Sequence, residues 1–154
     1  MVRLEKLSEE ERKHLVEAEC PSFTTNPFVA GPPLSQRRVA LISAAGIHRR
    51  TDRPFTRDTD DYYRIIPGNI KADELVMTHL SINFDRSGFQ QDLNVIFPVD
   101  RLREMAEGGI IGSVADFHYS FMGAHEPMKM EKQARHVAGL LKKDKVDAVL
   151  LLPV

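Results

Sequence analysis

The chain has 154 residues, of which 42% are hydrophobic and 28% charged, and this composition suits one globular domain with a core of its own. Its 21 basic and 22 acidic residues leave a formal charge of −1, so the charge balance gives no reason to expect nucleic acid or an anionic membrane as a partner. No stretch reaches the roughly 20 apolar residues of a membrane span, and the N-terminus lacks the apolar region of a signal peptide. A single cysteine, Cys20, cannot form an internal disulfide, so we expect a cytoplasmic location.

The first 37 residues predict two segments outside the main domain. Ser8 and Glu11 have the spacing of a capping box, in which each side chain bonds a free backbone N–H group at the start of a helix. A short polar helix is expected from Glu9 to Glu19, so residues 1–20 are predicted to form an N-terminal helical arm. Residues 21–37 contain four prolines and one glycine, which predicts an extended connector.

Residues 38–154 predict an α/β domain. A short apolar run from Arg38 to Gly46 is typical of a buried central strand that opens into a loop. The following segment, 47–61, is strongly polar and is expected to be a loop. Further strands are expected at 62–66, 75–80 and 94–97, followed by a helix at 98–107 that stops at two glycines.

The second half of this domain repeats the alternation of strand and helix. A short strand is expected at 110–114, then a loop that holds His118, Tyr119 and His125. Pro127 opens a helix with apolar residues at helical spacing, and 146–154 predicts a buried strand. Alternating strands and helices indicate an α/β fold with an open, mostly parallel sheet and flanking helices.

The end of the sequence is unusual for such a sheet. A parallel strand buried on both faces is normally followed by a covering helix, but none follows residues 146–154. One interpretation is an edge strand that happens to be last. Against it, an exposed apolar edge invites aggregation, so we expect the domain to be incomplete at its C-terminus.

Polar side chains follow the carboxyl end of the first strand, where binding sites form in open α/β sheets. Arg49 or Arg50 could hold a substrate carboxylate through two parallel hydrogen bonds, with Asp52 beside it, and His48 could move a proton. His48 is therefore a catalytic candidate, and Arg49 and Asp52 are substrate-binding candidates. A solvated polar loop is the alternative interpretation.

Two further histidines are catalytic candidates. His79 follows the third expected strand, with Ser81 as a substrate-binding candidate beside it, and the alternative is a loop histidine satisfied by the backbone. His118 lies next to Tyr119, and packing of an aromatic pair competes with a role at the site. We expect Tyr119 and Phe121 to belong to the core.

The sequence argues against metal and nucleotide sites. The six histidines show no paired ligand spacing, and one cysteine offers no thiolate set, so we expect no metal. Cys20 comes at the negative end of its predicted helix, where the helix dipole does not activate a thiol. No glycine-rich phosphate-binding motif follows a strand.

Several segments resemble the B-type subunits of the glycine/betaine/sarcosine/D-proline reductase family. The resemblance covers about residues 20 to 154. It rests on the segments RVALISAAGIH, YRIIPG, FPVDRLRE, IGS and HYSFMG, which occupy residues 38–48, 63–68, 97–104, 111–113 and 118–123.

The resemblance implies reductive cleavage of a C–N bond in a small amino-acid-type substrate. It implies a selenocysteine or cysteine as the reactive residue, a partner subunit that bears a pyruvoyl group, and electrons from a thioredoxin-like thiol donor. In the family the selenocysteine follows a strand similar to residues 146–154, so it is expected just beyond Val154. No cofactor bound by this chain itself is expected.

Selenocysteine is encoded by UGA, which is ordinarily a stop codon. One hypothesis is therefore that the sequence stops at a recoded UGA, and residues 1–154 alone would then be inactive. A true early stop that yields a fragment is the alternative. A different functional class also stays open, namely a non-catalytic docking module that binds a pyruvoyl-type subunit.

Overall fold

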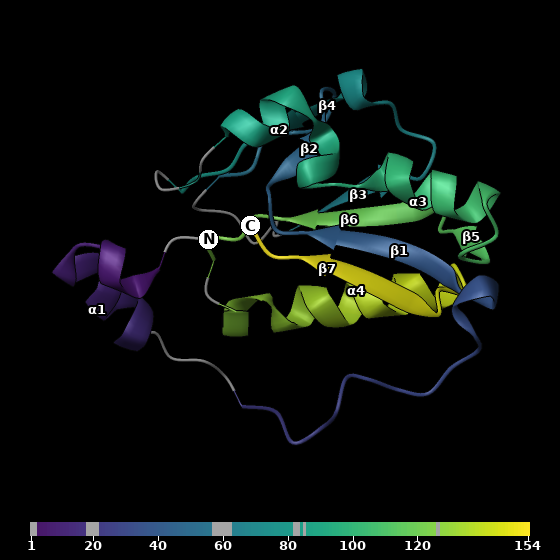
Figure 1. Ribbon diagram of the computed structural model, residues 1–154, viewed down its shortest axis with the longest axis horizontal. Coiled ribbons are helices and arrows are strands. Elements are labelled where there is room, and N and C mark those ends of the chain that lie inside the picture. The colour runs from purple at the N-terminus through teal and green to yellow at the C-terminus, as the bar shows by residue number, and fades with distance from the viewer. Residues whose placement is uncertain (1–2, 18–21, 57–62, 82–83, 85, 126) are drawn as a thin grey trace.

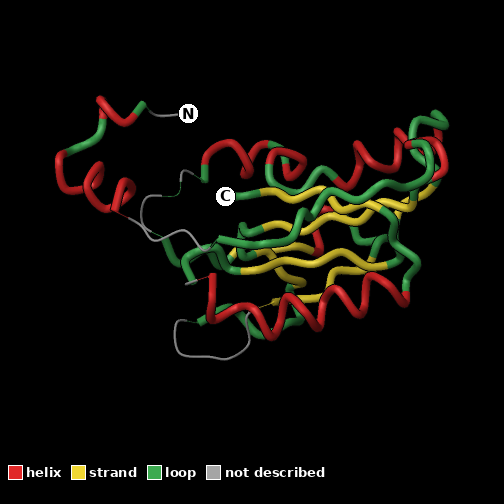
Figure 2. The backbone as a smooth tube through the Cα atoms, turned by 90° about the horizontal axis from the view of Figure 1, so that it is seen from below, coloured by secondary structure: helices red, strands yellow, loops and turns green. Residues whose placement is uncertain are grey.

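The computed structural model describes residues 3–17, 22–56, 63–81, 84, 86–125 and 127–154. One mostly parallel sheet forms the centre of the main domain (Figure 1). A long helix lies along one face of this sheet, and shorter helices lie over the other face (Figure 2). The predicted α/β class with an open, mostly parallel sheet and flanking helices is confirmed.

Strand β1 (Arg38–Ser43) is the centre of the sheet, with parallel partners on both sides. Strand β7 (Ala148–Leu152) pairs with it along five residues. The other side is shared by β5 (Ser113–Val114), which pairs with the start of β1, and β6 (Phe117–Phe121), which pairs with its end. β1 is apolar because both of its faces and both of its edges are covered.

The remaining strands are antiparallel to their neighbours. β3 (Tyr63–Pro67) pairs with β6 at an outer edge of the sheet. β2 (Ile47–Arg49) and β4 (Leu75–Met77) form a separate two-stranded ribbon beyond the end of β1. This ribbon returns the chain to the carboxyl edge of the sheet.

In the described part of the chain, the α-helices are α1 (Glu9–Glu17), α2 (Ser87–Gln91), α3 (Val99–Glu107) and α4 (Glu131–Lys143). Short 3-10 turns lie at Leu4–Lys6, Leu34–Gln36, Ala72–Glu74, Leu93–Val95 and Pro127–Met130. Among the described residues, none of these helices combines the length and apolar character needed to cross a membrane.

The core has two parts because side chains of a strand point alternately to the two faces of a sheet. On the α3 face, Leu41, Phe97 and Ile111 belong to the larger cluster of buried apolar residues. On the α4 face, Tyr119, Phe121 and Val137 form a smaller cluster. The prediction that Tyr119 and Phe121 are core residues is confirmed.

Several sequence-based assignments were wrong. Residues 47–49 were expected to lie in a loop but form strand β2, which pairs with β4. Residues 94–97 are not a strand, because the Asp92 side chain accepts the backbone N–H of Asn94 and caps a 3-10 turn there. The segment around His118 is not a loop. It is strand β6, whose aromatic residues alternate along one face of the sheet.

The N-terminal predictions hold as far as the described residues reach. Ser8 donates its backbone N–H to the Glu11 carboxylate, and the Ser8 hydroxyl accepts the backbone N–H of Glu11, as the capping box requires. The expected end of the helix and Cys20 lie outside the described residues. The division into an arm at 1–20, a connector at 21–37 and a domain at 38–154 stays a prediction.

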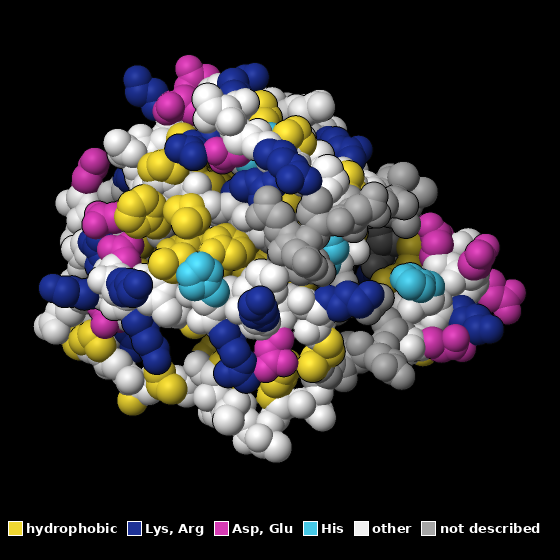
Figure 3. Space-filling model, turned by 180° about the vertical axis from the view of Figure 1, so that it is seen from behind, with side chains coloured by type: hydrophobic (Ala, Val, Ile, Leu, Met, Phe, Trp, Pro, Cys, Tyr) yellow, Lys and Arg dark blue, Asp and Glu magenta, His cyan; other side chains and the backbone are white. Residues whose placement is uncertain are grey.

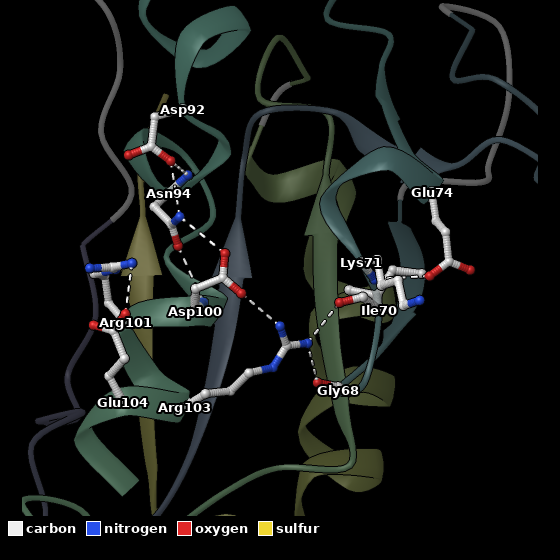
Figure 4. Close-up of polar contacts among 10 residues, drawn as sticks. All are labelled: Gly68, Ile70, Lys71, Glu74, Asp92, Asn94, Asp100, Arg101, Arg103 and Glu104. Atoms are coloured by element: carbon white, nitrogen blue, oxygen red, sulfur yellow. Dashed lines mark hydrogen bonds and ion pairs between the residues drawn. The ribbon is translucent and has the colours of Figure 1, made fainter. Parts of the chain in front are cut away.

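One arginine joins α3 to the chain after β3. The Arg103 guanidinium donates to the carbonyl oxygens of Gly68 at 2.8 Å and Ile70 at 2.7 Å, and to the Asp100 carboxylate at 2.7 Å (Figure 4). Asp100 in turn accepts a hydrogen bond from the side chain of Asn94. These bonds satisfy turn carbonyls that have few other donors nearby, so they fix helix α3 against the sheet.

Replacing Arg103 with Met should lower the free energy of unfolding by about 2 kcal/mol, because two carbonyl groups and one carboxylate lose charged donors. Arg101→Met is the matched control. Arg101 lies on the same helix, is largely exposed and, among the described residues, forms an ion pair only with Glu104, so its loss should change stability by at most about 0.5 kcal/mol. Urea unfolding of both variants checks this, and equal losses would contradict the role of Arg103.

Candidate functional site

Three parallel strands end at the same edge of the sheet and are tied together there by backbone hydrogen bonds. Ala44, which follows β1, donates its N–H to the Leu152 carbonyl of β7 at 3.0 Å. The Ala44 carbonyl accepts the N–H of Gly123 at 2.9 Å, just after β6. Gly46 donates its N–H to the Phe121 carbonyl at 2.9 Å. The turns after β1, β6 and β7 therefore form one contiguous carboxyl edge.

Gly46 also brings the β2–β4 ribbon to this edge. Its φ of 66° lies in the left-handed region, and a Cβ atom there would lie 2.8 Å from the carbonyl oxygen of Thr78. The backbone N–H of Thr78 donates to the Gly46 carbonyl at 2.9 Å. Only glycine allows this close approach, which places the segment after β4 beside the end of β1.

Gly123 leaves space where a side chain would otherwise stand. A Cβ atom at this position would lie 3.0 Å from the Ala44 carbonyl oxygen and 3.1 Å from the Val154 carbonyl oxygen. The end of β7 therefore lies directly against the turn after β6. His125 follows in this turn and donates through Nδ1 to the Met122 carbonyl at 3.0 Å.

His48 is buried beneath this edge and has partners at both ring nitrogens. Nδ1 lies 2.8 Å from the Arg49 carbonyl oxygen, which can only accept, so Nδ1 carries the proton. Nε2 lies 2.8 Å from the Thr78 hydroxyl, which donates to it when the ring is neutral. These two bonds fix the ring and its tautomer, and a role in proton transfer stays a prediction.

His79 lies in the same segment as Thr78. Its Nδ1 accepts the backbone N–H of Ser81 at 3.2 Å, so Nε2 carries the proton in the neutral ring. That Nε2 atom is buried and has no hydrogen-bond partner among the described residues. The ring packs on Phe84 with centroids 4.6 Å apart. Burial lowers the pKa of His79, and the positive charge of Arg86 lowers it further.

His118 lies within the sheet and not at its carboxyl edge. Its ring is fully buried, and Nδ1 accepts the backbone N–H of Leu41 in the middle of β1 at 3.1 Å. No backbone carbonyl takes this position, because the chain between β5 and β6 leaves the regular pairing with β1. The histidine side chain therefore completes the ladder, and its ring packs edge-on against Phe97.

Arg49, at the end of β2, forms an ion pair with Asp52. The Arg49 guanidinium donates to the Asp52 carboxylate at 2.7 Å and 3.0 Å. Burial alone would raise the pKa of Asp52, but the hydrogen bonds and charge of Arg49 lower it. Substrate binding by Arg49 and Asp52 stays a prediction that requires them to exchange partners.

The structure thus brings together only some of the candidates. His48, His79 and Ser81 cluster around Thr78, whereas His118 and the Arg49–Asp52 pair lie elsewhere. Sequence analysis missed Arg86, whose guanidinium donates to the His79 carbonyl at 2.7 Å, and no motif marks it. Sequence analysis also did not choose His125 as a site candidate, although this residue lies two positions after the family segment 118–123.

Metal binding finds no support in the described part of the chain. No group of three or more histidine, cysteine, aspartate or glutamate side chains there could hold a metal ion. Among the described residues, the edge instead offers backbone groups, histidine side chains and the arginine Arg86. Such a set can bind and orient a small polar molecule.

Comparison with known proteins identifies the family. Residues 2–153 match the sequence profile of glycine/sarcosine/betaine reductase selenoprotein B (GRDB). The chain belongs to this selenoprotein B family. No solved structure gives a significant match.

Relatives of the chain include proteins named as subunits of reductases. It is 34% identical over 120 residues to the D-proline reductase subunit gamma of Acetoanaerobium sticklandii, covering 77% of this chain and 49% of that protein. It is 30% identical over 139 residues to the glycine reductase complex component B subunit gamma of Symbiobacterium thermophilum, covering 85% of this chain and 32% of that protein. The chain therefore spans about half the length of the first relative and about a third of the second.

The segments that carry the selenoprotein B resemblance have clear structural roles. Residues 38–48 supply β1 and the turn at Gly46, residues 97–104 supply Arg103 and its helix, and residues 118–123 supply β6 and Gly123. Two of these three segments end at the carboxyl edge. The third segment, residues 97–104, packs on the face of the sheet that α3 covers.

His118 makes stability depend on pH. Burial lowers its pKa to about 4, and the charge of Arg103 acts in the same direction. In the unfolded chain a histidine titrates near about 6.5, so unfolding takes up almost one proton between these values. The stabilisation is complete above pH 6.5 and is lost as the pH falls toward 4, with a slope of up to about 1.4 kcal/mol per pH unit.

His118→Asn should flatten this dependence, because asparagine offers an acceptor to Leu41 but does not titrate. His136→Asn, at an exposed histidine, is the control and should keep the original slope. Urea unfolding between pH 7 and pH 5 measures all three proteins. Identical slopes would contradict the assignment.

Proposed function

We propose that this chain is the N-terminal part of a reductase subunit that cleaves a C–N bond in a small amino-acid-type substrate of the glycine, betaine, sarcosine or D-proline class. Membership of the selenoprotein B family supports the proposal, as do relatives named as subunits of D-proline reductase and of a glycine reductase complex. The observation that carries it furthest is the carboxyl edge, where the matched segments converge around Gly46 and Gly123.

The reaction has a simple balance. Cleavage of the C–N bond consumes two electrons and two protons, a new C–H bond and a free amine form, and a dithiol donor of the thioredoxin type is oxidised to a disulfide. A selenocysteine or cysteine would supply the nucleophile and a pyruvoyl group on a partner subunit would supply an activating carbonyl. The task of this chain is then to bind and orient the substrate and to exclude water.

We place the substrate at the carboxyl edge, beside the end of β7. In the family the reactive residue follows a strand similar to β7, and the Val154 carbonyl lies in the space that the missing side chain of Gly123 leaves. The turns after β1 and β6 are closely packed here, so the substrate would lie on the edge that they form. His125, half-buried in the turn after β6, would be the nearest proton-carrying side chain.

The substrate carboxylate would be held by the segment after β4. Arg86 is exposed and donates only to carbonyl oxygens in the described part of the chain, so its positive charge is uncompensated. The protonated Nε2 of His79 adds a donor without a partner, and Ser81 lies beside both. His48, fixed by the Thr78 hydroxyl, would position this segment against the end of β1.

An activity assay tests the proposal. The complete subunit, assembled with its partner subunits, should convert at least one of the four substrates while it consumes one equivalent of dithiothreitol. Prior alkylation with iodoacetate should abolish turnover, because a selenol or thiol is required. No turnover of any of the four substrates by the assembled complex would favour the alternative, a non-catalytic docking module.

A variant pair locates the substrate within the same assay. Arg86→Gln should raise KM about 10- to 100-fold, because a charged hydrogen bond to the carboxylate is lost. Arg50→Gln is the matched control, since Arg50 is an exposed arginine that likewise donates to a carbonyl, that of Asp73, at the other end of the ribbon. If both variants changed KM equally, the placement of the carboxylate would be wrong.

A further inference from the structure

Strand β7 has one edge without a partner in the described part of the chain. It pairs with β1 in parallel along five residues, and no other described strand pairs with it. The Leu152 carbonyl accepts the Ala44 N–H, and alternate residues of a parallel strand bond to the same neighbour. The backbone groups of Leu150 and Leu152 therefore face β1, and the N–H and carbonyl groups of Val149 and Leu151 face the free edge.

The side chains of β7 are apolar on both faces of the sheet, although the strand lies at its edge. Val149 and Leu151 point to the α4 face and are 38% and 65% exposed, and Leu150 points to the opposite face and is 43% exposed. Figure 3 looks onto the α4 face, where hydrophobic side chains stay uncovered among the charged ones. A natural edge strand is normally protected by charged side chains, whereas a run that is apolar on both faces is typical of an interior strand of a parallel sheet. β7 therefore has the sequence of an interior strand with one neighbour missing.

A groove of about 300 Å³ lies between this strand and α4, and we call it the β7–α4 groove. Phe121 and Leu151 of the sheet line it on one side, and Ala134, Ala138 and Leu141 of α4 line it on the other. The two alanines lie one turn apart, and such small side chains let a second helix approach α4 closely. A helix in this groove would also cover Leu151.

Chain direction and handedness indicate what occupies the groove and the free edge. β6 and β7 lie on opposite sides of β1, so α4 carries the chain past β1 in a crossover between parallel strands. Such crossovers are right-handed in about 98% of cases. A further crossover that leaves β7 in the same direction therefore places its helix on the same face as α4, which lies along one face of the sheet in Figure 2, and its strand against the free edge.

The relatives are long enough to hold such a crossover. A crossover between parallel strands needs about a dozen residues or more. The matched part is 49% of the D-proline reductase subunit gamma and 32% of the glycine reductase subunit gamma, so more than enough chain lies outside it in both proteins.

We propose that the segment that follows Val154 in the complete subunit forms a helix in the β7–α4 groove and then a strand parallel to β7 at its free edge. The helix would cover Val149 and Leu151, and the strand would bond to their outward backbone groups and cover part of Leu150. The proposal rests on that part of the proposed function which continues the subunit beyond Val154. Because the added strand is parallel to β7, its carboxyl end would join the edge formed by the turns after β1 and β6. The turn after the added strand would then be a further wall of the candidate site.

A variant pair tests the helix in the groove. Leu151→Asp should lower the urea midpoint of the complete subunit by about 1 M or more, because it would bury a carboxylate beneath a helix. Ile110→Asp is the matched control, since Ile110 is 53% exposed just after α3 and away from β7, so the midpoint should shift little. Equal shifts of the two midpoints would contradict a helix over Leu151.

Hydrogen exchange of the isolated complete subunit, resolved to single amides, tests the strand. The amides of Leu150 and Leu152 bond to β1 and are internal controls, because they should exchange slowly whatever lies at the free edge. With a strand paired there, the amides of Val149 and Leu151 should exchange at least about 100-fold more slowly than free amides of the same sequence. Free exchange of these two amides, with Leu150 and Leu152 protected, would overturn the proposal.

Other outcomes separate the alternatives. Protection of Val149 and Leu151 only at concentrations at which sedimentation shows a dimer would assign the edge to a second copy. Protection that appears only after a partner subunit is added would assign it to that subunit. Either result would overturn the proposal.

The exchange readout is also independent of turnover. If the assembled complex converts substrate while the two amides exchange freely, the placement of the helix and strand is wrong and the proposed function stands. If the amides are protected in a complex without turnover, the placement stands and the proposed function is wrong.

Discussion

The structure depends on four backbone hydrogen bonds at the end of β1. Ala44 bonds to β7 through its N–H and to the turn after β6 through its carbonyl, and Gly46 bonds to β6 and to the segment after β4 in the same way. Two residues thus connect four segments that are far apart in the sequence. The connection requires the left-handed conformation of Gly46 and the missing side chain of Gly123, because a Cβ atom at either position would meet a carbonyl group closely.

This junction explains why histidines gather near it without being equivalent. His48 and His79 reach it through the segment after β4, where Thr78 is bonded both to Gly46 and to the His48 ring. His118 contributes one layer deeper, where it replaces a missing backbone acceptor in the sheet. A site built on strand ends that are held on both sides is rigid, which favours the precise placement of a small substrate.

Much of the fold could be predicted from the sequence. The periodicity of β1, α3 and α4 is strong, and family segments fall on β1 and α3. Residues 94–97 were assigned as a strand because Ile96 and Phe97 are apolar, but a capping aspartate turns the chain there, and both side chains enter the core from a turn. Among the site candidates, the contact between His48 and Thr78 depends on strand pairing across 30 residues, which no local pattern encodes. The mutual pairing of Arg49 and Asp52 likewise follows from ribbon geometry.

The central claim is that the substrate binds at the carboxyl edge formed by the turns after β1, β4 and β6. Hydrogen exchange of the assembled reductase complex, measured by mass spectrometry with and without substrate, tests it most directly. Substrate should slow exchange in residues 44–46, 78–81 and 122–125 and leave residues 49–52 unchanged. Protection confined to residues 49–52, or to the face that carries α4, would contradict the claim.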